Sequence, residues 1–465
     1  MSSKEVVGMK RDTTAKRSWP YHHGMSKVQQ KVGAGEAALA LLIALPVFMH
    51  TSLHAADALP VAGDFLGEIR RDASGQLIVV PPAKPDASSQ HVMSEPVAGA
   101  RTIQVGPGHA LKTIGAAAAL AKDGDTIEIE PGEYRRDVAV WKQDNLTIRG
   151  MGNNNAISGA GVKLIADGAS AEGKAIWVVR GGAITVENIE FSEARVADKN
   201  GAGIRFEKGR LVVRKCRFVH NENGILTSGG DAELDIVDSE FGHNGHGDGY
   251  SHNLYVGALK RLRVTGSYFH HAQVGHLLKS RAAENHILYN RLSDESGGRA
   301  SYELEFPNGG IAYVIGNIIE QSATTENPTI ISFGAEGYKG PKNELYLINN
   351  TIDNNRPAGA TFLNVKPGAQ IVKAYNNLLI GKGPLNNGIN GEFINNPNVD
   401  WESFVLAQHH DYRIKRASSL HRSFRSPGSA GAIDLTPTGE YVHPATSRPL
   451  LTTPTLPGAR QTLQP

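Results

Sequence analysis

Between residues 126 and 380 the sequence repeats a short run in which apolar and polar residues alternate and which ends in a bulky apolar side chain. The last apolar residues of these runs recur every 23 to 33 positions and are Phe191, Phe218, Phe241, Phe269, Leu292, Ile319, Ile352 and Leu379. Alternation with a period of two residues is typical of β-strands and differs from the 3.6-residue period of a helix. Gly, Asn, Asp and Ser gather between the runs, as turns require.

A single unit of this kind cannot bury its apolar face. Stacking the units at the ~4.8 Å spacing of neighbouring strands gives a continuous core lined by Phe and aliphatic ladders. The repeat therefore predicts an all-β chain, a parallel β-helix (solenoid) of about ten coils. An irregular β-sandwich is the alternative, and the shared register of eight repeat positions argues against it.

The flanking segments predict the ends of this stack. Residues 110–134, "ALKTIGAAAALAKDGDTIEIEPGEY", predict an Ala-rich amphipathic helix, a Gly-Asp turn and a first strand. This opening resembles the N-terminal cap of right-handed parallel β-helix proteins of the pectate-lyase-like superfamily, which implies a right-handed helix over residues 101–385 with a helical cap. Residues 386–465, where the apolar ladder fades, are expected to form a C-terminal tail that covers the open end. Residues 59–100 are rich in Pro and Ala and predict an extended leader or linker.

The N-terminal region predicts export. Ala37–Met49 is a 13-residue apolar run, preceded by Lys27 and Lys31 and followed by the small residues Ala56–Ala58. Thirteen residues are short for a membrane span, which needs about 20, but suit the apolar core of a secretory signal. We therefore expect residues 1–58 to be a signal peptide region and the protein to be secreted or periplasmic, with an uncleaved anchor as the alternative. No later segment resembles a membrane span.

Charge and cysteine content narrow the class of protein. The formal net charge is +2, and it falls to −1 without residues 1–58, which hold seven Lys/Arg and four Asp/Glu. A nearly neutral chain gives no electrostatic reason to expect nucleic acid as a partner. Cys216 is the only cysteine, so no internal disulfide can form. The oligomeric state cannot be predicted from these features.

Polar side chains concentrate on three successive coils, where stacking would bring them into one groove. Seven of the 18 histidines lie within residues 243–286. The candidate residues of the first coil are His243, His246, Asp248, Tyr250, His252, Asn253 and Tyr255. Those of the second coil are His270, His271, His276, Lys279 and Arg281. Those of the third coil are Arg299, Glu303, Glu305 and Asn308, with Glu336 one coil further.

Several of these residues have ordinary structural alternatives. His243, His246 and His252 would lie on one loop without the fixed spacing of a zinc site, and each could simply shape a polar turn. Lys279 points into the core if Leu277 is inward, where a lone charge is costly, and outward if Leu278 is inward; we favour the outward register. Glu303 and Glu305 share one side of their strand, either as calcium ligands or as a solvated face.

The mixture of cations, carboxylates and imidazoles suits β-elimination of a uronate polymer. Arg, Lys or Ca²⁺ would neutralise the substrate carboxylate and make the C5 proton more acidic. The predicted catalytic residues are Lys279, His276, His252, Tyr255 and Arg281, with Lys279 or His276 as the base and a tyrosine as the proton donor. The predicted substrate-binding residues are His246, Asp248, Tyr250, Asn253, Arg299 and Asn308, and the predicted calcium ligands are Glu303 and Glu305.

These residues predict an acidic polysaccharide as partner and a lyase or a C5-epimerase as activity, since both reactions begin with the same proton abstraction. The polymer and its linkage are not predicted. A glycoside hydrolase, which needs two or three carboxylates across the scissile bond, and a non-catalytic polysaccharide-binding or structural protein are the alternatives.

Two further resemblances bear on the same coils. "HLLKSRAAENHILYN" resembles the Lys-Ser-x-x-x-Asn stretch of the chondroitinase B and alginate lyase family, which implies Lys279 as base. The sequence departs from that family where an "RHG" arginine is expected, because it reads "EFPNGG" there. Glu303 and Glu305 also follow the lysine, whereas the calcium ligands of that family precede it. "DGYSHNLYVG" and "SYELEFPNGG" resemble a group of exported bacterial β-helix proteins over about residues 100–450, which implies the fold and no activity.

Overall fold

The computed structural model describes residues 68–71, 77–80, 99–152 and 161–462. The chain divides into two compact units, Met1–Gln90 and His91–Pro465. In the first unit the described residues form an antiparallel hairpin of β1 (Glu68–Arg71) and β2 (Leu77–Val80), where the composition of the leader predicts extended chain. The predicted signal peptide region lies outside the described residues.

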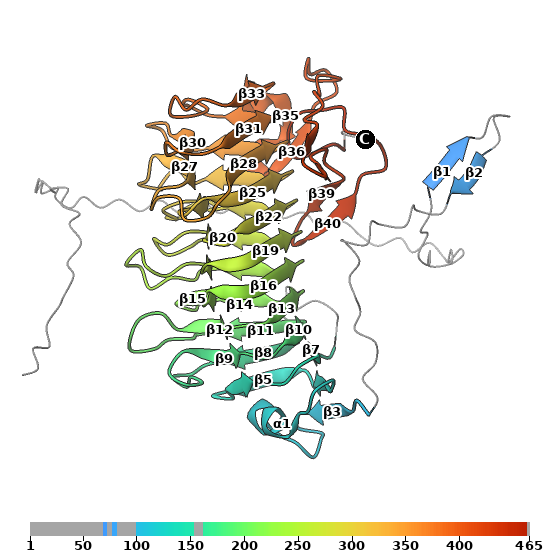
Figure 1. The fold of residues 1–465 in the computed structure, drawn as a ribbon, viewed down its shortest axis with the longest axis vertical. Helices are drawn as coiled ribbons and strands as arrows, with labels where there is room; N and C mark the ends of the chain where they lie inside the picture. Colours follow the sequence, from blue (N-terminus) through green and yellow to red (C-terminus); the bar gives the residue numbers. More distant parts are fainter. Residues whose placement is uncertain (1–67, 72–76, 81–98, 153–160, 463–465) are drawn as a thin grey trace, which may run out of the picture. The chain divides into compact units, whose positions relative to one another are not determined.

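The second unit is built from three parallel sheets whose strands follow one another around successive coils (Figure 1). Sheet 1 contains β3 (Thr102–Val105), β4 (Thr126–Ile129), β7 (Leu146–Gly150), β10 (Ala183–Glu187), β13 (Arg210–Arg214), β16 (Gly230–Val237), β19 (Leu259–Thr265), β22 (Glu284–Leu288), β25 (Gly310–Ile315), β28 (Asn343–Ile348), β31 (Ile371–Tyr375) and β33 (Glu392–Ile394). Sheet 2 contains β5 (Gly132–Arg135), β8 (Val162–Ile165), β11 (Ile189–Ser192), β14 (Arg217–Val219), β17 (Glu240–Gly242), β20 (Tyr268–His270), β23 (Arg291–Ser293), β26 (Ile318–Gln321), β29 (Thr351–Asn354), β32 (Leu378–Ile380) and β34 (Asn398–Val399). Sheet 3 contains β6 (Ala139–Trp141), β9 (Ala175–Val179), β12 (Ala202–Phe206), β15 (Asn223–Thr227), β18 (Leu254–Val256), β21 (Leu278–Ser280), β24 (Leu304–Phe306), β27 (Thr329–Phe333) and β30 (Thr361–Val365). The predicted parallel β-helix is confirmed, and its strands continue past residue 385 to Val399.

The predicted ladder forms the core. Phe191, Phe218, Phe241 and Phe269 are fully buried, and their rings stack at centroid distances of 5.0, 4.7 and 4.7 Å. Leucine and isoleucine continue the same ladder at 292, 319, 352 and 379, directly in register. Each coil thus covers the apolar side chain of the coil before it, which a single unit cannot do alone.

Asparagine ladders close the corners of the coils. The Asn317 amide donates to Asn350 Oδ1 at 3.0 Å, and the Asn350 amide donates to Asn377 Oδ1 at the same distance. In the "NN" pairs the first residue, Asn349 or Asn376, has a positive φ of 51° or 56°. The second residue of each pair enters the ladder. Asn therefore serves both as the left-handed corner residue and as a buried hydrogen-bonding group.

The N-terminal end carries the one α-helix of the described residues, α1 (Ile114–Leu120). Thr113 caps it by accepting a hydrogen bond from the Ala116 backbone, and the helix buries Ile114, Ala117 and Ala118 against the first coil. It begins four residues later than the start of the Ala-rich segment at residue 110. No helix in the described ranges is long and apolar enough to cross a membrane.

The C-terminal tail packs on the outside of the sheets. It contains β35 (Phe404–Leu406), β36 (Asp411–Ile414), β37 (Ser429–Ala430), β38 (Ile433–Asp434), β39 (Gly439–Val442) and β40 (Thr446–Pro449), with short 3-10 turns at Trp401–Ser403 and Ala407–His409. Tyr412 and Tyr441 pack on outward apolar side chains of sheet 2, and Leu435 packs on those of sheet 1. The buried residues of the tail thus cover outer faces of the helix, where the sequence predicts a cover for its open end.

Candidate functional site on sheet 3

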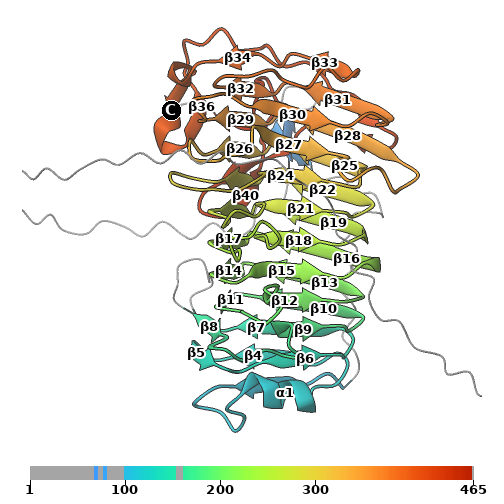
Figure 2. The ribbon, with the colours of Figure 1, turned by 90° about the vertical axis from the view of Figure 1, so that its left-hand side faces the viewer.

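One row of outward side chains runs along sheet 3, which faces the viewer in Figure 2. The strand register places Arg205 beside Leu226, Leu226 beside Tyr255, Tyr255 beside Lys279 and Lys279 beside Glu305. The row forms because alternation turns Ile204, Leu254, Leu278 and their equivalents inward. Residues a hundred positions apart in sequence therefore share one surface.

An open cleft of about 530 Å³ lies over the N-terminal half of this row. Its lining residues are Asp198, Lys199, Asn200, Arg205, Asn223, Leu226, Thr227, Ser228, Gly229, Asp248, Tyr250, Tyr255, Gly257 and Arg281. Three cations, two carboxylates and two tyrosines thus face the same space. Of these, Tyr250 is 82% exposed at the rim, while Tyr255 and Arg281 belong to the floor.

Arg281 connects the cleft to an ion-pair network. Its Nη1 donates to the Tyr255 hydroxyl oxygen at 2.7 Å, and its guanidinium lies 5.1 Å from the centre of that ring. Its Nη2 donates to Glu336 at 2.7 Å. Burial alone would raise the pKa of Glu336, but the hydrogen bond from Arg281 and the charge of Lys279 hold it below its ordinary value. Arg281 is therefore fixed in place by a carboxylate on one side and presents a donor to Tyr255 on the other.

Lys279 lies between two carboxylates. Its Nζ is 3.1 Å from Glu305 Oε2 and 3.2 Å from Glu336 Oε1. These ion pairs and its register beside Tyr255 and Glu305 place Lys279 on the outward row, as favoured from the sequence. Both contacts make Lys279 part of an ion-pair network. Its predicted role as base stays a prediction that this arrangement disfavours.

Two buried histidines lie behind the row. His276 Nε2 is 2.8 Å from Glu305 Oε2, and the His276 backbone donates to His252 Nδ1 at 2.9 Å. Burial lowers the pKa of both imidazoles, that of His252 well below its ordinary value, although Glu305 opposes the shift for His276. The His252 ring contacts the Tyr255 ring edge to face at 5.0 Å. These histidines are placed to hold Tyr255 and Glu305 in position.

Arg205 is a cation of the cleft that has no partner among the described residues. Within the described residues its side chain forms no ion pair or hydrogen bond, and its Nε is buried without an acceptor. A guanidinium with unused donors at the floor of a cleft is suited to bind a carboxylate. Arg205 could have been found from the sequence, because the alternation in "GIRFEKG" turns Ile204 and Phe206 inward and Arg205 outward.

The structure separates other predicted site residues from this cleft. Asn253 is fully buried, where its Oδ1 accepts from the Asn244 amide at 2.9 Å; its predicted role in substrate binding is wrong, because it belongs to a corner ladder. His246 lies 3.5 Å from Glu222. Arg299 is exposed in the loop after β23, and the Asn308 amide donates to the Gly337 carbonyl in the turn after β24. None of these last three lines the cleft.

Glu303 and Glu305, which the sequence places on one side of a strand, have different surroundings, because Glu303 precedes β24 and Glu305 lies within it. Glu305 is engaged by His276 and Lys279, and these contacts lower its pKa against the effect of burial. Glu303 is fully buried, and burial together with the nearby carboxylate of Asp294 raises its pKa well above the ordinary value. A protonated carboxyl group and a carboxylate already paired with cations are poor calcium ligands. Calcium binding here stays a prediction.

Sequence reasoning also missed a polar row on sheet 2. The residue just before each Phe of the ladder points outward, which brings Glu190, Arg217, Glu240 and Tyr268 into register. Arg217 lies 2.9 Å from Glu190 and 3.1 Å from Glu240. The histidines considered for zinc are divided between the two surfaces, since His252 lies behind sheet 3 and His243 stacks on His271 beside sheet 2.

A family model supports the fold of the central coils. Residues 134–292 match a family model described as a right-handed beta helix region. Among solved structures, a pectate lyase is 13% identical with a TM-score of 0.47, covering 74% of this chain and 98% of its own. A pectin methylesterase from Aspergillus niger is 13% identical with a TM-score of 0.36, covering 69% and 98% respectively. No curated protein sequence matches the chain.

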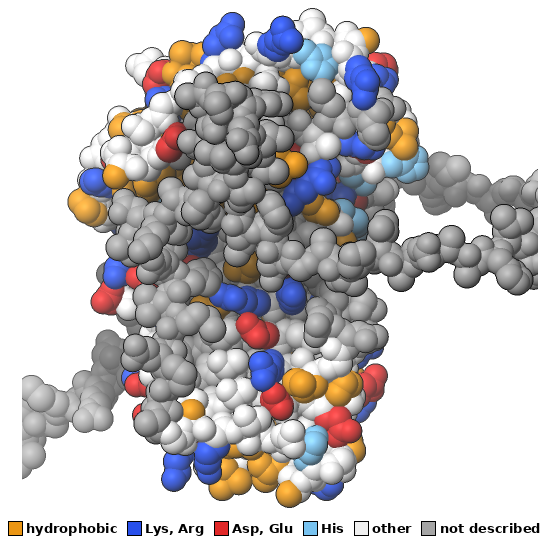
Figure 3. All heavy atoms as spheres, turned by 90° about the vertical axis from the view of Figure 1, so that its right-hand side faces the viewer, with side chains coloured by type: hydrophobic (Ala, Val, Ile, Leu, Met, Phe, Trp, Pro, Cys, Tyr) orange, Lys and Arg blue, Asp and Glu red, His pale blue; other side chains and the backbone are white. Residues whose placement is uncertain are grey.

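The surface carries charges of both signs. In Figure 3, Lys and Arg side chains are interspersed with Asp and Glu on the face shown. The sheets, the ladder and the family match together establish that this protein is a right-handed parallel β-helix.

Proposed function

We propose that the cleft on sheet 3 binds an acidic polysaccharide and that the protein abstracts the C5 proton of a uronate unit, as a lyase or a C5-epimerase. The observation that carries this proposal is the 2.7 Å contact between Arg281 and the Tyr255 hydroxyl oxygen, in a cleft that also contains Arg205, which has no partner among the described residues. The cleft is open along the sheet, as an extended polymer requires.

Each group has a defined part in the reaction. Arg205 pairs with the uronate carboxylate and withdraws its negative charge, which makes the C5 proton more acidic. Tyr255, as the phenolate balanced by Arg281, accepts that proton. In the lyase the C5 electrons form the C4–C5 double bond, the bond from C4 to the glycosidic oxygen breaks, and the leaving oxygen takes the proton that Tyr255 has accepted. In the epimerase water protonates C5 on the opposite face, and Tyr255 returns its proton to the hydroxide that this leaves.

This assignment gives Tyr255 the role of base that the sequence suggests for Lys279. Lys279, Glu305 and Glu336 then act as a charged support that fixes Arg281, while His276 fixes Glu305. Catalytic groups need such support, because small displacements of a base from its proton cost rate.

A non-catalytic polysaccharide-binding protein is the second candidate. The observation that favours it is the mutual neutralisation of Lys279, Arg281, Glu305 and Glu336, which is also what a purely structural network would show. Such a protein would retain the carboxylate contact of Arg205 and lack proton abstraction.

The test is incubation of the purified protein with polygalacturonate, alginate and chondroitin sulfate, followed by ultraviolet absorbance of the unsaturated uronate and by co-sedimentation with the polymer. An increase in this absorbance would show that the protein is a lyase. Binding without absorbance leaves the epimerase and the binding protein, which C5 proton exchange separates. Absence of binding to every uronate polymer would refute the proposal.

We also propose that the protein is exported, since its substrate class lies outside the cytoplasm and the 13-residue run at Ala37–Met49 fits a secretory signal. N-terminal sequencing of protein recovered from the periplasm or medium should give a chain that begins near Ala56 or Leu59. A recovered chain that begins at Met1 or Met25 would contradict export by cleavage.

A further inference from the structure

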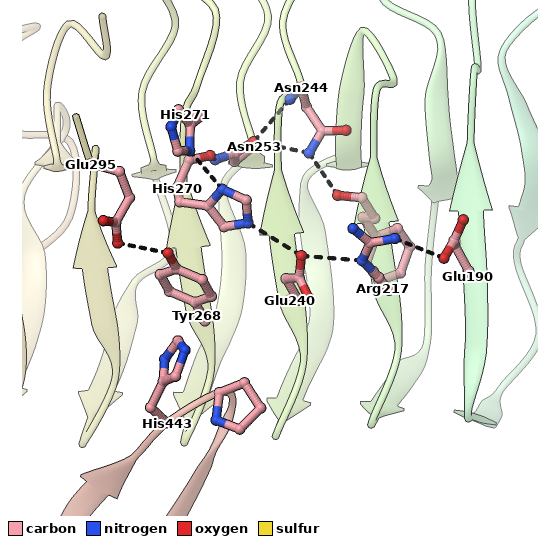
Figure 4. A network of polar contacts seen from close by, with 12 residues as sticks. Glu190, Arg217, Glu240, Asn244, Asn253, Tyr268, His270, His271, Glu295 and His443 are labelled. Atoms are coloured by element: carbon pink, nitrogen blue, oxygen red, sulfur yellow. Dashed lines mark hydrogen bonds and ion pairs between the residues drawn. The ribbon is translucent and has the colours of Figure 1, made fainter. Parts of the chain in front are cut away.

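Three histidines meet at a corner of the coils beside sheet 2, away from the cleft. His270 ends β20, His271 follows it, and His243 follows β17 one coil earlier. His243 and His271 occupy equivalent corner positions with φ of 55° and 46°, and their rings stack at 4.6 Å. Figure 4 shows His270 and His271 pointing toward one another.

The ring nitrogens of these residues converge. His270 Nδ1 lies 2.9 Å from His271 Nδ1, and one ligand atom from each of the three histidines lies within 4.8 Å of the others. In the part of the chain that the structure describes, this is the one group of three or more His, Cys, Asp or Glu with that property. Imidazole nitrogens are the preferred ligands of zinc and related transition metals.

A carboxylate orients the central ring. His270 Nε2 is 3.2 Å from Glu240 Oε1, and Glu240 is held in turn by Arg217 at 3.1 Å (Figure 4). A carboxylate paired with arginine accepts hydrogen bonds, so Nε2 carries the proton of neutral His270 and Nδ1 carries the lone pair. That lone pair faces His271. A carboxylate that fixes the tautomer of a ligating histidine is the usual outer support of a protein metal site.

The backbone leaves room for this ring. Gly242 lies beside His270 in the register of β17 and β20. A Cβ atom at position 242 would lie 2.2 Å from His270 Cε1 and 2.3 Å from its Nε2. The ring of His270 can therefore lie across the preceding strand, between Glu240 and His271, only because residue 242 is glycine.

We propose that His243, His270 and His271 bind a divalent transition-metal ion of the zinc class. Three imidazoles supply three ligands, and the half-buried His243 and His271 leave the fourth position on the solvent side. This site is separate from the cleft on sheet 3 and does not depend on the function proposed for it. It also differs from the set of His243, His246 and His252 considered from the sequence.

The test uses full-length protein without a histidine tag, stripped of metal with a chelator and titrated with Zn²⁺ by calorimetry. The wild type should bind one ion, and Co²⁺ should give the visible absorption of a low-symmetry histidine site. His270→Gln and His271→Asn should each weaken Zn²⁺ binding by at least tenfold, and Glu240→Gln should weaken it by about tenfold to a hundredfold, as loss of an outer support does. Zn²⁺ should raise the melting temperature of the wild type, since an ion that binds only the folded state stabilises it.

His409→Asn, which changes an exposed histidine outside the group, is the matched control and should bind Zn²⁺ as the wild type does. Circular dichroism of each variant without metal verifies that it is folded. If His271→Asn fails this check, His270→Gln and Glu240→Gln decide. Equal Zn²⁺ affinity in the wild type and in folded His270→Gln, or no stoichiometric binding in the wild type, would overturn the proposal.

Discussion

Arg281 Nη1 lies 2.7 Å from the Tyr255 hydroxyl oxygen, and the opposite side of the same guanidinium holds Glu336. The three residues come from different coils of one solenoid, and the stacking of those coils alone brings them together. The pair marks the boundary between an open, polar cleft and a closed ion-pair network. A cation fixed in this way stabilises negative charge on the phenol oxygen without having to move during the reaction.

Tyr255→Phe tests the proposed base. Removal of the hydroxyl should lower turnover of the uronate polymer by about 10²- to 10⁴-fold, the usual contribution of a positioned base. Polymer binding and the melting temperature should change little, because the ring and its contact with His252 remain. Tyr250→Phe, which removes the hydroxyl of the exposed tyrosine at the rim, is the control. Equal turnover in the two variants would exclude Tyr255 as the base.

Arg205→Gln tests carboxylate recognition. Loss of a charged hydrogen bond of about 1.5–3 kcal/mol should weaken binding of acidic oligosaccharides by at least tenfold. Binding of the corresponding neutral, carboxyl-reduced oligosaccharide should not change. Arg263→Gln, at an exposed arginine of sheet 1, serves as the control in the same calorimetric titration. A similar loss for charged and neutral sugars would mean that Arg205 only shapes the cleft.

Phe241→Ala tests the ladder. The ring is fully buried and stacks on Phe218 and Phe269 at 4.7 Å, so its truncation should cost about 3–5 kcal/mol of unfolding free energy. Denaturant unfolding measures this loss. Leu451→Ala, at a side chain that is 98% exposed, should leave the unfolding midpoint unchanged. A stable Phe241→Ala variant would contradict the account of the core.

We predict that the ion pair between Asp125 and Arg101 loses its stabilising effect in acid. Its hydrogen bond with Arg101 lowers the pKa of its carboxyl from 3.8 to about 2. Because the folded-state pKa is depressed, this stabilising contribution is present above pH 4 and is lost as the pH falls toward 2. The stability difference between wild type and Asp125→Asn should therefore shrink over that range. Asp231→Asn, at an exposed side chain, should show no such trend; a constant difference for Asp125→Asn would refute the assignment.

The ladder could be predicted from the sequence because it depends on one rule, namely that apolar side chains at a repeated strand position face inward. The same rule predicts the outward rows, since Arg205 and Glu240 each adjoin an inward aromatic residue. It fails where alternation is interrupted. Leu277 and Leu278 are both fully buried, so the sequence alone leaves two registers open for Lys279.

Other site residues depend on neighbours across the loops that connect sheet 2 to sheet 3. Asn253 has a polar side chain of the kind that binds sugars, yet its Oδ1 accepts a hydrogen bond from the amide of Asn244 inside a corner. Glu303 resembles a calcium ligand until Asp294, from the start of the same loop, is found beside it. Neither contact follows from local spacing, because corner lengths vary between coils and shift which residues meet.

The most direct test of the central claim is C5 proton exchange. Oligouronates from polygalacturonate and alginate are incubated with the wild type and with Tyr255→Phe in deuterium oxide, and the C5 position is followed by NMR. The account predicts that the wild type forms an unsaturated or C5-deuterated sugar from at least one of these substrates and that Tyr255→Phe does so at least a hundredfold more slowly. Retention of every C5 proton by a wild-type protein that binds the sugar would show that the cleft is not catalytic.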